Sequence, residues 1–138
     1  MSKAILLDTH TWIWLINGQP KFSSKILKLI NQAASANAIF VSAISVWELS
    51  MLESKERIIL TQPVNDWIKD ALNAPGIQLI PLLPEISVES CRLPGNFHGD
   101  PADRIIVATA RIKKLSIITK DKKILTYSKN HWVSAISP

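Results

Sequence analysis

Short apolar runs alternate with longer stretches of helical spacing along the chain, and this alternation constrains the fold more than any other feature. The runs are short and rich in Ile, Val and Leu, which indicates buried strands. Buried strands separated by helices are typical of a parallel sheet, because parallel neighbours need a crossover connection. The expected strands are residues 4–7, 39–41, 77–80, 116–119 and 132–136.

Between the strands, the spacing of apolar residues predicts helices at residues 11–16, 24–36, 43–54, 64–72, 85–93 and 101–113. Three of them have recognisable start signals. Ser42 can cap the third, Pro63 can open the fourth, and Asp100 followed by proline can start the sixth. We therefore predict an α/β fold: a three-layer α/β/α sandwich with a central, mainly parallel sheet. The length of 138 residues fits one domain, so we expect residues 1–138 to form a single unit.

Acidic residues stand where the elements of such a fold meet one edge of the sheet. Asp8 ends the first expected strand, and Asp121 follows the fourth. The helices run antiparallel to the strands, which brings their amino termini to the same edge. Asp100 and Asp103 open the sixth helix there, and Glu48 lies in the second turn of the third. Ligands of open α/β sheets bind at this edge, so we expect the five carboxylates to converge on a site.

Each carboxylate also has an ordinary structural interpretation. Asp100 and Asp103 read well as a capping pair, and Asp8 and Asp121 as turn residues. Glu48 is harder to explain in this way, because its helix is apolar around most of its circumference and we expect the side chain to be buried. A buried carboxylate needs a partner, and the partners that we expect nearby are the other carboxylates.

Carboxylates gathered in one place share protons or bind a cation. Oxygen donors without a cysteine pair or paired histidines favour a hard divalent ion, Mg²⁺ or Mn²⁺. Such an ion commonly acts on phosphate oxygens. The chain has 16 Lys and Arg against 11 Asp and Glu, a net charge of +5, which favours a polyanion. Together these features predict hydrolysis of a nucleic-acid phosphodiester.

Three lysines surround Asp121. We expect Lys120, Lys122 and Lys123 to contact the phosphate backbone of a nucleic acid, with a solvated helix start as the equal alternative. Trp12 and Trp47 are expected in the core or in a dimer interface.

Four motifs in this order resemble a known family. "LLDTHTWIW", "SAISVWEL", "GDPADRIIVATA" and "IITKD" resemble the PIN-domain ribonucleases, in particular the VapC-like toxins of type II toxin–antitoxin systems. The resemblance implies a PIN-like fold and a Mg²⁺- or Mn²⁺-dependent endoribonuclease that cleaves RNA with an activated water. It also implies a homodimer and a cognate antitoxin that covers the acidic site.

The resemblance also assigns roles by position. Asp8, Glu48, Asp103 and Asp121 match the four acids that hold the metal and carry catalysis, and Thr119 and Asp100 would support them.

Two other functions stay open. The first is a catalytically silent PIN-like module that binds RNA or protein. The second is an aspartate-based phosphotransfer domain, although the phosphatase pattern requires a second aspartate where this chain has His10.

The single cysteine, Cys91, makes an internal disulfide impossible and points to a reducing compartment. No apolar run approaches the roughly 20 residues that a membrane-spanning helix needs. We therefore expect a cytoplasmic protein.

Overall fold

The computed structural model describes residues 4–138 and contains a five-stranded sheet in the order β3-β2-β1-β4-β5. Every neighbouring pair of strands is parallel, as predicted. The chain builds outward from β1 in both directions, so the strand order reverses beside β1. The strands are β1 (Ile5–Leu7), β2 (Ile39–Ser42), β3 (Ile77–Ile80), β4 (Ser116–Ile118) and β5 (Ser134–Ile136).

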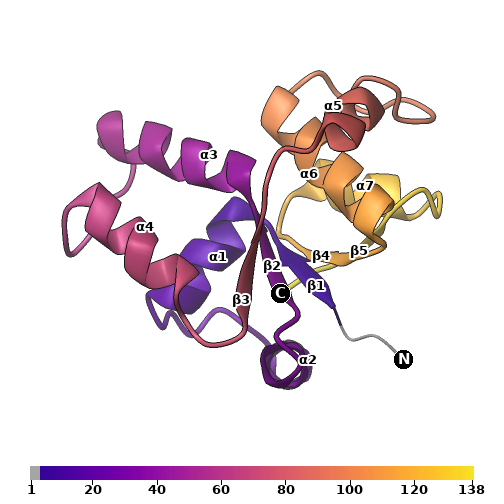
Figure 1. Ribbon diagram of the computed structural model, residues 1–138. Coiled ribbons are helices and arrows are strands. Elements are labelled where there is room, and N and C mark those ends of the chain that lie inside the picture. Colours follow the sequence, from indigo (N-terminus) through magenta and orange to yellow (C-terminus); the bar gives the residue numbers. More distant parts are fainter. Residues whose placement is uncertain (1–3) are drawn as a thin grey trace.

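Helices cover both faces of the sheet and complete the three-layer α/β/α sandwich (Figure 1). One face packs against α1, α2 and α4, and the other against α5, α6 and α7. The helices are α1 (Thr9–Ile16), α2 (Ser24–Ser35), α3 (Ala43–Ser54), α4 (Val64–Leu72), α5 (Pro84–Ser90), α6 (Pro101–Lys113) and α7 (Lys122–Ser128).

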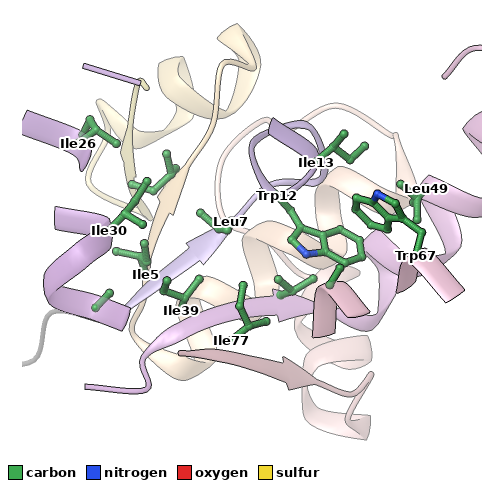
Figure 2. Close-up of a cluster of buried hydrophobic side chains, with 14 residues drawn as sticks. Ile5, Leu7, Trp12, Ile13, Ile26, Ile30, Ile39, Leu49, Trp67 and Ile77 are labelled. Carbon is green, nitrogen blue, oxygen red and sulfur yellow. The ribbon is translucent and has the colours of Figure 1, made fainter. Parts of the chain in front are cut away.

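The two core clusters follow from the alternation of side chains along each strand. In β1, Ile5 and Leu7 join the cluster of one face, and Leu6 joins the cluster of the other. Figure 2 shows the first cluster, in which Trp12 and Trp67 pack edge to face with ring centroids 5.2 Å apart. Burial on both faces explains why the central strands are almost wholly apolar.

The cap signals in the sequence are confirmed. The hydroxyl of Ser42 accepts a hydrogen bond from the backbone N–H of Ile44, and Asp100 caps α6. Such caps satisfy backbone N–H groups that a helix start leaves without intrahelical partners.

The structure corrects two expectations. The helix α7 is absent from the predicted set, although Asp121 caps it in the same way as Asp100 caps α6. The run is only seven residues long and too short for a clear apolar period. Trp47 is 55% exposed on α3, so it does not belong to the core as Trp12 does.

Within residues 4–138, no helix is both long enough and apolar enough to span a membrane.

Candidate active site

An acidic cavity opens at the carboxyl edge of the sheet, where β1 and β4 lie side by side and the strand order reverses. This position is the usual ligand site of open α/β sheets, because the connections leave β1 and β4 in opposite directions. The cavity has a volume of 300 Å³. It is lined by Asp8, His10, Glu48, Asp100, Asp103, Lys120 and Asp121, and so contains all five of the predicted carboxylates.

A larger cavity of 510 Å³ lies at the other end of β4 and β5. Its lining includes Arg111 and Lys114 but no carboxylate. The acidic cavity is therefore the better candidate on chemical grounds, although it is smaller.

Asp8 is fixed by both of its carboxylate oxygens. Oδ1 accepts a hydrogen bond of 2.8 Å from the backbone N–H of Thr9 and caps α1, and Oδ2 accepts one of 2.6 Å from the hydroxyl of Thr119. Thr119 is fully buried, and Asp8 is 8% exposed. The end of β1 thus holds the carboxylate in a single orientation at the cavity wall.

Glu48 is half-buried, and its partner is a hydroxyl. The hydroxyl of Thr9 donates a hydrogen bond to Oε1 of Glu48 and lies 2.9 Å from the hydroxyl of Ser45. Because Thr9 directly follows Asp8, one turn of chain holds both carboxylates. The other carboxylates line the same cavity as expected, but the hydrogen-bond partner of Glu48 is the hydroxyl of Thr9.

Asp100 and Asp103 share the start of α6 but not the same role. Oδ1 of Asp100 accepts hydrogen bonds from the backbone N–H groups of Ala102 at 2.9 Å and Asp103 at 3.2 Å. The Asp103 side chain lies against His98, with its Oδ2 3.2 Å from Nε2 of the imidazole. These two atoms are close enough for an ion pair, but they lack the alignment of a hydrogen bond.

Asp121 links the end of β4 to α7. Its Oδ1 accepts hydrogen bonds from the backbone N–H groups of Lys123 and Ile124, and its own N–H donates to Thr119 at 2.9 Å. Thr119 therefore connects Asp8 with Asp121. Among the three predicted lysines, Lys120 lines the acidic cavity, whereas Lys122 and Lys123 line a neighbouring pocket.

The electrostatics of the cavity favour neutralisation. Burial raises the pKa of Asp8, and the hydrogen bonds from Thr119 and Thr9 partly oppose the rise. Burial also raises the pKa of Glu48. The pKa of Asp103 is raised to about 7, first by burial and then by the charges of the other carboxylates. A cation in the cavity would relieve this repulsion.

The donor set fits a hard divalent ion, because the cavity offers carboxylate oxygens that repel one another when ionised. Among residues 4–138, however, no group of three or more His, Cys, Asp or Glu side chains is already arranged to hold a metal ion.

Sequence reasoning expected His98 beside the site as a supporting residue, but it missed Thr9 and Ser45. The hydroxyl of Thr9 contacts Glu48, Ser45 contacts the hydroxyl of Thr9, and His98 contacts Asp103. Thr9 had a detectable signal, because a hydroxyl beside Asp8 at a helix start can reach into the same cavity. Ser45 had none, since only the packing of α1 against α3 brings it to Thr9.

Comparison with known proteins shows the family of the chain. Residues 5–130 match the family model of the PIN domain. The chain is 32% identical over 123 residues to Ribonuclease VapC22 of Mycobacterium tuberculosis, an alignment that covers 89% of this chain and 91% of that protein.

Solved structures with the same fold come from toxin–antitoxin complexes. One is VapBC2 from Rickettsia felis bound to a promoter DNA fragment, with a TM-score of 0.68 and 16% identity over 97% of this chain and 98% of that chain. Another is DNA-bound VapBC from Salmonella typhimurium, with a TM-score of 0.69 and 15% identity over 97% of each chain. These likenesses confirm the fold, and the family match confirms the resemblance that the sequence motifs indicated.

Proposed function

Because this chain belongs to the PIN domain family, we propose that it is an endoribonuclease of the VapC type, the toxin half of a toxin–antitoxin pair. The observation that carries the proposal is the convergence of Asp8, Glu48, Asp103 and Asp121 on one cavity at the reversal of strand order. The relative of this chain from Mycobacterium tuberculosis, at 32% identity, is a ribonuclease. We further infer that residues 1–138 form one PIN-like domain.

In this proposal Asp8, Glu48, Asp103 and Asp121 hold Mg²⁺ or Mn²⁺. When bound, such an ion polarises a phosphate oxygen and makes a nearby water a better nucleophile for the phosphodiester. Without a cation the like charges in the cavity repel, and a bound cation would relieve this repulsion in competition with protons.

The protein itself supplies orientation. Thr119 and the N–H of Thr9 hold the two oxygens of Asp8, and the hydroxyl of Thr9 holds Glu48. Fixed acceptors reduce the reorganisation that the reacting groups need. Lys120 brings a positive charge to the cavity wall, where it can attract the phosphate backbone of RNA. Asp100 supports the site as the cap of α6.

The partners follow from the same family. The structural neighbours are VapBC complexes, so we propose a cognate antitoxin for this chain as well. An acidic cavity is suited to a cationic side chain of such a partner, which would compete with the metal. Homodimerisation and a cytoplasmic location are further expectations of this proposal.

A second candidate is the catalytically silent PIN-like module. It is favoured by one observation, that no three donors among the described residues are already arranged to hold an ion. The retention of all four acids in one cavity favours the enzyme.

The test separates the two candidates. Purified, antitoxin-free protein would be incubated with structured RNA in Mn²⁺, alongside Asp8→Asn and Glu48→Gln. Calorimetric titration with Mn²⁺ would be run on each. We expect the wild type to bind Mn²⁺ and cleave RNA, and both variants to lose cleavage by at least about 100-fold.

Asp70→Asn is the matched control, since Asp70 is an exposed carboxylate on α4 that does not line the cavity. It should behave like the wild type. If the wild type neither binds Mn²⁺ nor cleaves RNA, the nuclease proposal fails. RNA binding without cleavage would favour the silent module.

A further inference from the structure

A second pocket lies beside the acidic cavity. It has a volume of 350 Å³, within the range of about 300–1,000 Å³ that is usual for ligand sites. The loop before α6 forms one wall and α7 forms the other. Its lining includes Asn96, Phe97, His98, Lys122, Lys123 and Tyr127.

The walls of this pocket are held by contacts across the chain. Arg104 donates hydrogen bonds to the carbonyl oxygens of Phe97 at 3.0 Å and His98 at 3.2 Å. The hydroxyl of Tyr127 donates to the carbonyl oxygen of Pro94 at 2.6 Å. The rings of Phe97 and Tyr127 pack edge to face at 4.9 Å. The pocket is thus preformed, which reduces the entropy cost of binding.

The pocket and the acidic cavity adjoin at two places, where a residue of one lies next to a residue of the other. His98 lines the pocket, and its Nε2 lies 3.2 Å from Oδ2 of Asp103, which lines the cavity. Asp121 lines the cavity, and the next residue, Lys122, lines the pocket. A linear polymer that has one unit in the acidic cavity can therefore place the adjoining unit in the pocket.

The chemistry of the lining matches a nucleotide. Aromatic rings stack on bases, lysines bind phosphate and the Asn96 amide can pair with a base edge. We propose that this pocket binds a nucleotide of single-stranded RNA next to the phosphodiester that is cleaved in the acidic cavity. The proposal rests on the ribonuclease function proposed above and names how that substrate is held.

A protein tail is a weaker occupant for this pocket. A segment that enters the acidic cavity would do so with cationic side chains, and Lys122 and Lys123 would repel its neighbouring cations. RNA has the opposite pattern, since its phosphates suit the lysines and its bases suit Phe97 and His98.

The experiment measures RNA binding without cleavage. The probe is a short single-stranded oligoribonucleotide carrying 4-thiouridine and a fluorophore, titrated by anisotropy in EDTA at several salt concentrations and then photo-crosslinked. The proteins are the wild type, Phe97→Leu, the pair Lys122→Ala/Lys123→Ala, and the control pair Lys25→Ala/Lys28→Ala. Both control lysines are exposed on α2, line neither cavity and change the net charge by the same amount.

We expect crosslinked peptides to contain residues 96–98 or 122–130. A plot of log affinity against log salt has a negative slope. The Lys122→Ala/Lys123→Ala pair should make this slope shallower by about 1.4, because each phosphate contact with a single strand contributes about 0.7. Phe97→Leu should weaken binding about five-fold or more through lost stacking. The control pair should leave the slope close to that of the wild type.

Cleavage in Mn²⁺ by the same proteins keeps the two proposals distinct. If the wild type cleaves RNA but the pocket variants match the control pair and crosslinks fall elsewhere, the subsite is wrong and the nuclease stands. If crosslinks fall in the pocket but nothing is cleaved, the subsite stands and the nuclease fails. The subsite proposal is overturned if the RNA does not bind. It is also overturned if the lysine variants bind RNA as the wild type does and lose only the binding of a partner protein's tail.

Discussion

Replacing Asp103 with asparagine should stabilise the metal-free protein, although it removes a proposed metal ligand. Burial and the neighbouring carboxylates raise the pKa of Asp103 to about 7, whereas its ordinary value is 3.8. The folded chain therefore binds a proton more tightly than the unfolded chain. Stability falls as the pH rises between these two values, because ionisation then costs more in the folded state. Asparagine resembles the protonated carboxyl group and avoids this cost.

The magnitude follows from the two pKa values. At pH 8 the group is ionised in both states, and a pKa raised from 3.8 to about 7 corresponds to at most about 4 kcal/mol. At pH 5 the folded chain keeps its proton, and the cost is below about 2 kcal/mol. Because the side chain is 15% exposed and partly solvated, we expect Asp103→Asn to gain about 2–4 kcal/mol at pH 8 and clearly less at pH 5.

The assay is urea unfolding followed by far-UV circular dichroism in EDTA at pH 5 and pH 8. Asp70→Asn is the control, because this exposed carboxylate on α4 lies outside the acidic cavity and its replacement should change stability by less than about 0.5 kcal/mol at either pH. In Asp103→Asn the new amide would keep an oxygen near His98, so the contact at the start of α6 is not simply deleted.

Two results would refute the reasoning. The first is that Asp103→Asn is no more stable than the wild type at pH 8. The second is an equal gain at both pH values, which would mean that ionisation of Asp103 is not the cause.

Other predictions test the supports of the site and the backbone. Added Mn²⁺ should raise the free energy of unfolding of the wild type more at pH 8 than at pH 5, and Asp8→Asn should lose that gain in the same urea assay. Thr119→Val should cost about 1–3 kcal/mol, because it leaves Oδ2 of Asp8 and the N–H of Asp121 without their partner. Asp100→Ala should cost about 1 kcal/mol and Asp100→Asn much less, since asparagine keeps the cap of α6; a similar loss in both would point to charge instead. Gly76→Ala should cost at least about 1 kcal/mol in thermal unfolding, because φ is +83° and the new Cβ would lie 2.6 Å from the backbone of Ala34.

Much of the fold was accessible to pattern reasoning, because each strand carries its own local signal. The apolar runs that became β1 and β4 could be recognised without knowledge of their neighbours, since a strand buried on both faces must be apolar throughout. Their ends were less certain. The predicted strand at 132–136 begins only at Ser134, because the parallel pairing with β4 starts at Ser116.

The helix α7 shows the limit of local patterns. Its sequence after Asp121 is short, and its inward side is visible only once Ile124 and Tyr127 are seen packed beneath α6 and the loop before it. Its cap could have been found, because Asp121 lies three residues before Ile124 in the same way that Asp100 lies three before Asp103.

The sequence by itself determined which carboxylates could meet. Asp8 and Asp121 follow strands, Asp103 and Glu48 lie in early turns of helices, and parallel topology brings strand ends and helix starts to one edge. Only the tertiary structure decided what holds them there. Hydroxyl partners such as Thr119, and the pocket beside the acidic cavity, depend on contacts between segments that are far apart in the chain, and a hydrogen bond across 111 residues leaves no periodic trace in a sequence.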